Sequence, residues 1–98
     1  MILVRDVFQL KFGKAKEVKA LWSDVVRLVR KHGHGPSRAM FDVTGPYYTF
    51  VMESTHENLA AFEKAGKEMM GDAEFGGWYQ KFVPLIESGH REIFDLLP

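Results

Sequence analysis

The second half of the chain constrains the fold most, because a strand, an amphipathic helix, an aromatic helix and another strand follow one another there. Ser54 and Glu57 are spaced as a capping box, which predicts that a helix opens where the preceding strand ends. The aromatic segment 75–86 predicts a second, shorter helix that finishes at Pro84, since proline cannot donate a backbone hydrogen bond. Residues 91–97 then predict a closing strand.

The first half supplies the remaining elements. Residues 2–12 alternate as a strand, and the apolar spacing of residues 14–31 predicts an amphipathic helix. Residues 38–44 and 47–53 predict a strand pair joined by a turn at Gly45-Pro46. This β-α-β-β-α-(short α)-β order is typical of an α+β, ferredoxin-like split βαβ fold. It comprises a four-stranded antiparallel sheet, two long helices and one short helix.

Composition limits the classes of function. A chain of 98 residues forms one domain, residues 1–98. Thirteen Lys and Arg balance thirteen Asp and Glu, so no net charge favours nucleic acid or an anionic membrane. The chain has no cysteine, which excludes disulfides and thiolate chemistry. No apolar run reaches the roughly 18 residues of a membrane span, and charge appears at Arg5, so a cytoplasmic protein is expected.

The chain resembles the NIPSNAP-like members of the dimeric α/β-barrel superfamily over essentially its whole length. The likeness rests on residues 5–10 with Phe12-Gly13-Lys14, on Ala20-Leu21-Trp22, on Met52-Glu53-Ser54 with Leu59, and on residues 75–86. The resemblance implies a homodimer whose two sheets pack face to face into a barrel with the helices outside. It also implies a pocket between sheet and helices in each protomer.

Residues 2–12 support the homodimer independently. Both faces of this strand carry apolar side chains: Ile2, Val4, Phe8 and Leu10 on one, and Leu3 and Val7 on the other. Helices on one side of the sheet would leave the second set exposed to water, so a partner sheet is expected to cover it.

The resemblance leaves the activity open, because the superfamily includes cofactor-free monooxygenases, haem-degrading enzymes, small decarboxylases and isomerases. Haem-degrading relatives use a strand amide, a tryptophan and a histidine where this chain has Asp6, Ala65 and Tyr79, so haem degradation is not expected. We expect a pocket for a small apolar or aromatic metabolite, with monooxygenase-like or isomerase-like chemistry and no tightly bound cofactor. The alternative is a non-catalytic dimeric binding or scaffold protein.

Three residues are candidates for acid–base chemistry. Asp6 interrupts an apolar face, so it is either paired with Arg38 or Arg91, or a pocket carboxyl with a raised pKa. His90 and Glu92 are two residues apart on a predicted strand and share a face. They could work as an acid–base pair or lie on a solvated or interface surface. A metal would need further ligands at recognisable spacing, and no metal site is predicted.

A ligand pocket is predicted between the sheet and residues 75–82. Trp78 and Tyr79 are expected on its wall, with Tyr48 or Phe50 opposite, although each ring could instead be core. Gly76-Gly77 should weaken this helix, which suggests a close backbone approach or a movable segment.

The remaining histidines are given structural roles. The run His32-Gly33-His34-Gly35 is interpreted as the end of the first helix. His56 is expected to be exposed in the first turn of the next helix.

Overall fold

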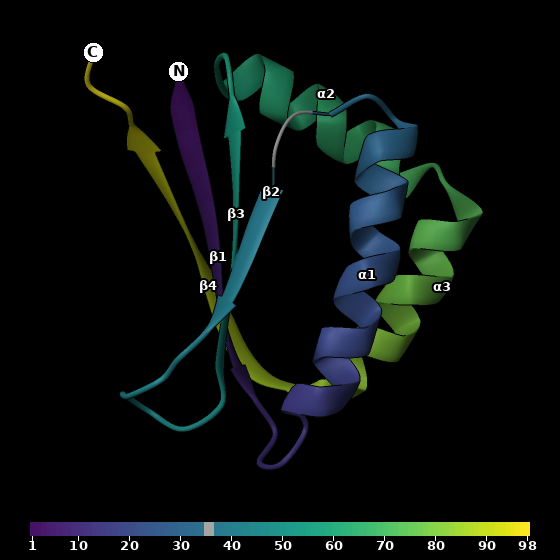
Figure 1. The fold of residues 1–98 in the computed structure, drawn as a ribbon. Coiled ribbons are helices and arrows are strands. Elements are labelled where there is room, and N and C mark those ends of the chain that lie inside the picture. The colour runs from purple at the N-terminus through teal and green to yellow at the C-terminus, as the bar shows by residue number, and fades with distance from the viewer. Residues whose placement is uncertain (35–36) are drawn as a thin grey trace.

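The computed structural model describes residues 1–34 and 37–98, so Gly35, part of the predicted helix end, lies outside the described residues. Three helices cover one face of an antiparallel sheet with strand order β2-β3-β1-β4, which confirms the α+β ferredoxin-like fold (Figure 1). The elements are β1 (Ile2–Leu10), α1 (Ala15–Lys31), β2 (Ser37–Phe41), β3 (Thr49–His56), α2 (Leu59–Met70), α3 (Ala73–Phe82), a 3-10 turn (Val83–Leu85) and β4 (Ile86–Asp95).

Several element boundaries differ from the sequence prediction: β1 ends at Leu10, β2 ends at Phe41 and β3 begins at Thr49. The capping box is wrong: β3 continues to His56, and Asn58 caps α2 by accepting a hydrogen bond from the backbone N–H of Ala61 at 2.9 Å. The last strand starts at Ile86 rather than at residue 91. It does so because β4 pairs with the whole of β1, with a register shift at Gln9/Leu10. The chain thus enters the strand directly after the 3-10 turn that contains Pro84.

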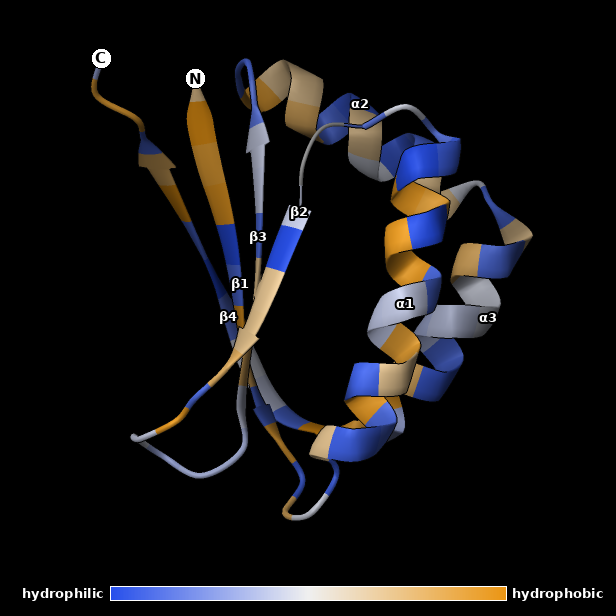
Figure 2. Ribbon diagram, viewed as in Figure 1, coloured by the Kyte–Doolittle hydropathy of each residue, from blue (hydrophilic) through white to orange (hydrophobic). Residues whose placement is uncertain are grey.

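The core lies between the sheet and helices α1 and α3. Figure 2 shows hydrophobic and hydrophilic residues alternating along α1, as expected for a helix that covers a sheet with one side. Trp78 is 7% exposed, stacks on Phe82 with ring centroids 4.8 Å apart, and donates its indole N–H to the carbonyl of Leu21 at 2.7 Å. The fully buried side chains are Val4, Leu10, Val18, Leu28 and Phe50.

Asp72 ties the end of α1 to the start of α3. Its carboxylate accepts hydrogen bonds from His32 at 2.8 Å, from Lys31 at 3.1 Å and from the backbone N–H of Glu74 at 2.8 Å. These three donors, His32 foremost, hold the pKa of the Asp72 carboxyl well below its usual value. Helix α3 therefore begins at a carboxylate that stays ionised until strongly acidic pH.

Asp72→Asn should make the stability of the protein less sensitive to acid. A carboxyl whose pKa is lowered by folding stabilises the protein above its unfolded pKa, and this contribution is lost as pH falls toward the folded pKa. We expect wild type to lose stability below about pH 4 more steeply than the variant, in urea titrations at stepped pH. Asn still caps the helix. Asp95→Asn, at the exposed end of β4, is the control and should follow wild type. If the free energy of unfolding falls equally steeply with pH in all three proteins, this role of Asp72 is contradicted.

The outer face of the sheet carries a row of charges across all four strands. The strand register aligns Arg38, Glu53, Arg5 and Glu92. Glu53 is only 8% exposed, with Arg38 Nε at 2.6 Å and Arg5 Nε at 3.7 Å, and Arg5 Nε lies 3.8 Å from Glu92. The same alternation places apolar side chains around this row: Leu3, Val7, Met40, Val51 and Phe94. Within residues 1–34 and 37–98, no helix covers this face (Figure 1).

A helix that spans a bilayer must be both long and apolar. Among the described residues, none is both long enough and apolar enough to span one.

Candidate functional site

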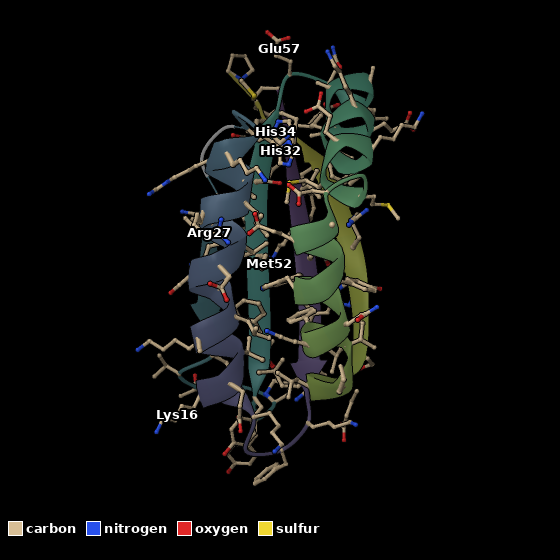
Figure 3. All side chains as sticks on the ribbon, turned by 90° about the vertical axis from the view of Figure 1, so that its right-hand side faces the viewer. Lys16, Arg27, His32, His34, Met52 and Glu57 are labelled. Atoms are coloured by element: carbon tan, nitrogen blue, oxygen red, sulfur yellow. The ribbon has the colours of Figure 1, made fainter. Side chains whose placement is uncertain are left out.

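A cavity of about 920 Å³ lies between the inner face of the sheet and the three helices. Met52 of β3 faces it, and Figure 3 shows this residue behind the space between α1 and α3. Most of the lining is apolar, and each helix contributes to it. The main apolar contributors are Phe8, Trp22, Val25, Val29, Phe62, Ala65, Met69, Phe75 and Phe82.

The structure places the predicted aromatic residues unequally. Trp78 and Tyr79 line the cavity, and Tyr79 is 55% exposed. Phe50 is 1% exposed in the core and Tyr48 lies in the turn before β3, so neither is among the residues lining this cavity. The opposite wall is formed further along β3, by Met52, Ser54 and His56.

No other backbone segment among the described residues lies close to Gly76 or Gly77. A Cβ built on either glycine meets no atom within 4 Å outside the local helix backbone. The close-contact interpretation of this pair is therefore wrong for the described residues. The pair leaves open space beside the cavity, which Gly76 helps to line.

Asp6 is paired, which was one of its two predicted states. Its carboxylate accepts hydrogen bonds from Arg91 Nε at 2.6 Å and from Arg91 Nη2 at 3.5 Å, while Arg38 pairs with Glu53 instead. The Arg91 guanidinium also lies over the Phe62 ring, 4.9 Å from its centroid. This ion pair and ring form part of the polar end of the cavity.

His90 and Glu92 are brought together, but away from Asp6. His90 Nε2 lies 3.5 Å from Glu92 Oε2, and Glu92 also faces Arg5 in the outer row of charges. His90 borders the cavity, yet the alternation of β4 directs its side chain to the outer face together with that of Glu92. The three predicted acid–base residues therefore divide between the two faces of the sheet.

A histidine that the sequence prediction placed in a helix lies instead in the cavity wall. His56 is the last residue of β3, and its Nε2 lies 3.0 Å from Ser54 Oγ on the same face of the strand. Burial, and secondarily His34, lower the pKa of His56 below its usual value of about 6.5, so its imidazole is neutral at pH 7. The alternation Met52-x-Ser54-x-His56 was the signal that could have found it.

His34 approaches the same end of the cavity from α1. It follows the last turn of that helix, at the end of the molecule where Glu57 also lies (Figure 3). Its Nε2 is buried and 3.1 Å from Glu68 Oε2, without hydrogen-bond geometry. The polar end thus combines histidine and serine side chains with the Asp6–Arg91 pair.

Within residues 1–34 and 37–98, no group of three or more His, Cys, Asp or Glu side chains is arranged to hold a metal ion.

Comparison with solved structures shows the fold shared across low sequence identity. A NIPSNAP family protein with unknown function from Agrobacterium tumefaciens is 20% identical, with a TM-score of 0.86 over 96% of this chain and 86% of that one. A NIPSNAP-like domain protein from Burkholderia xenovorans is 17% identical, with a TM-score of 0.85 over 99% and 84%. An antibiotic biosynthesis monooxygenase is 17% identical, with a TM-score of 0.78 over 100% of both chains.

These neighbours agree with the resemblance that the sequence motifs indicated. No protein-family model matches the chain, and no curated protein matches its sequence. Similarity at this level of identity establishes architecture and leaves activity open. The chain is NIPSNAP-like in its fold, a ferredoxin-like α+β domain of the kind found in the NIPSNAP proteins and in the monooxygenase.

Proposed function

We propose that this protein binds a small apolar or aromatic metabolite in the cavity between sheet and helices. The observation that carries the proposal is the lining: apolar walls from the sheet and all three helices, with Asp6, Arg91, Ser54 and His56 on neighbouring positions of β1, β4 and β3 as its polar end. Its volume of about 920 Å³ falls in the range of small-molecule sites, roughly 300–1,000 Å³. An apolar ligand would gain burial from the walls and orientation from the polar end.

We further propose that the working form is a homodimer joined through the outer sheet faces. Support comes from the apolar side chains around the row of charges on that face. Glu53 lies between two arginines, so this face carries charges of both signs that a second copy could complement. A cytoplasmic location also stays a prediction.

Cofactor-free monooxygenase-like or isomerase-like chemistry is the enzymatic form of this proposal. Its specific support is the shared fold with an antibiotic biosynthesis monooxygenase. The acid–base roles predicted for Asp6, His90 and Glu92 stay predictions, and of these Asp6 has its carboxylate in the cavity wall. The alternative is a non-catalytic binding protein that uses the same cavity without chemistry.

Native mass spectrometry of protein purified from its own host tests this proposal. We expect the mass of a homodimer, with an additional small molecule released on activation in the gas phase. A second sample, extracted with organic solvent and refolded, should lose that mass and regain it from a host extract. A monomer that never carries or regains a small molecule would contradict the proposal.

A further inference from the structure

His56 differs from the other histidines of the chain in its partner. The chain has four histidines. His32 pairs with Asp72, His34 with Glu68 and His90 with Glu92, all within 3.5 Å. Among the described residues His56 has no carboxylate at ion-pair distance, and its one polar partner is the hydroxyl of Ser54. No carboxylate therefore favours its protonated form.

The surroundings of His56 keep it neutral and place it against a ligand. Both His56 and Ser54 line the cavity. Phe62 of α2 packs on the imidazole with ring centroids 5.1 Å apart, and the Arg91 guanidinium lies over the same phenyl ring. The charged groups nearby already have partners: Arg91 pairs with Asp6, and the Glu68 carboxylate lies 3.1 Å from His34 Nε2. Burial and His34 both lower the pKa of His56, so its basic form dominates at pH 7.

We propose that Ser54 and His56 form an acid–base pair that enolises an apolar ketone bound in the cavity. This inference rests on the proposed function, because it assigns chemistry to the same cavity. His56 Nε2 would accept the proton from the carbon next to the carbonyl, and the C–H electron pair would form the enolate. The hydroxyl of Ser54, freed from Nε2, would donate its hydrogen bond to the enolate oxygen. Returning the proton from His56 to oxygen gives the enol, and returning it to carbon regenerates the ketone.

Enolisation suits this pair better than attack by serine. A nucleophilic serine needs a base that is itself oriented by a third group. In the part of the chain that the structure describes, no carboxylate takes that role for His56. Proton transfer needs only a neutral base and a hydrogen-bond donor within reach of each other, and the 3.0 Å separation of Nε2 and Oγ provides both.

Hydrogen exchange of 2-tetralone in deuterated water tests the proposal. This bicyclic aromatic ketone has acidic protons between its ring and its carbonyl, and proton NMR follows their replacement by deuterium. We expect wild type to catalyse exchange, His56→Gln to lose about 10²–10⁴-fold in rate, and Ser54→Ala to lose less. His32→Gln is the matched control, since His32 lies at the α1–α3 junction, outside the cavity lining, and it should exchange at the wild-type rate.

The pH profile adds a readout that does not depend on a variant. The rate should rise with pH through a midpoint below about 6.5 and level off above it, because deprotonated His56 is the base. If His56→Gln does not fold, this wild-type profile decides: a flat profile overturns the proposal. Equal loss of exchange in His32→Gln and His56→Gln also overturns it.

Binding is measured separately from exchange, by the response of tryptophan fluorescence to 2-tetralone. Binding without protein-catalysed exchange overturns the acid–base role and leaves the proposed binding function standing. Absence of binding at millimolar ketone overturns both the acid–base role and the proposed binding function.

Discussion

Trp78→Ala should lower the free energy of unfolding by about 3–5 kcal/mol, the range for removing a large aromatic side chain from a core. Trp78 is 7% exposed and lies between Phe75 and Phe82, with ring centroids 5.6 Å and 4.8 Å away. The substitution also leaves the carbonyl of Leu21 without its indole donor. Urea titration followed by circular dichroism measures the change.

Tyr79→Ala is the matched control for this prediction. Tyr79 is the next residue of α3 and lines the same cavity, but it is 55% exposed. We expect it to lose less than about 1 kcal/mol of stability. If Trp78→Ala is as stable as Tyr79→Ala, Trp78 is not a core residue, and its role is confined to the pocket wall that the sequence predicted.

Glu53→Ala should both destabilise the protein and shift the proposed homodimer toward monomer. The change removes the carboxylate between Arg38 Nε at 2.6 Å and Arg5 Nε at 3.7 Å. Arg5 Nε is buried and, among the described residues, would keep only Glu92, at 3.8 Å, as an ionic partner. We expect a loss of about 2 kcal/mol, below the 3–5 kcal/mol of a fully buried pair, because Arg38 is 74% exposed.

Sedimentation velocity across a concentration series measures the change in assembly for Glu53→Ala. Thr55→Ala lies two residues further along β3 on the same outer face, outside the row of charges, and should sediment as wild type. A Glu53→Ala protein with unchanged stability and unchanged sedimentation would show that the row of charges contributes to neither folding nor association.

The sequence predicted the fold because its periodic segments are long and clearly separated. The two-residue alternation from Ile2 and the helical spacing from Val18 to Val29 fixed the element types, and the structure confirms them. The boundaries were less certain, because two N-capping signals compete after residue 53. Ser54 and Glu57 satisfy the capping-box spacing, yet the pairing of β3 with β1 extends to His56 and Asn58 becomes the cap. Tertiary pairing thus outweighed the local signal.

That boundary error also hid the candidate site. With residues 54–57 assigned to a helix, Ser54 and His56 could not be placed on one strand face. Pairing of Asp6 with Arg38 or Arg91 could be offered as one of two states, because opposite charge is the common solution for a carboxylate among apolar neighbours; the choice of Arg91 depends on the strand register. His34 could not be assigned to the cavity, because its position depends on how the end of α1 meets α2.

The methionine methyl groups offer the most direct test of the cavity as a ligand site. The chain has five methionines; Met52, Met69 and Met70 line the cavity, whereas Met1 and Met40 do not. Protein labelled with 13C at the methionine methyls reports all five positions in one NMR spectrum. Gly66→Leu is the control variant, since a side chain begun at Gly66 enters open space beside the cavity and should obstruct it.

We expect 2-tetralone to shift the methyl signals of Met52 and Met69, with nuclear Overhauser effects to the ligand. The methyl signals of Met1 and Met40 should not shift. In Gly66→Leu the same shifts should need about tenfold more ligand, equivalent to roughly 1.4 kcal/mol of binding free energy. Shifts confined to Met40 on the outer sheet face, or no shift of Met52 and Met69 at saturating ligand, would contradict a binding cavity between sheet and helices.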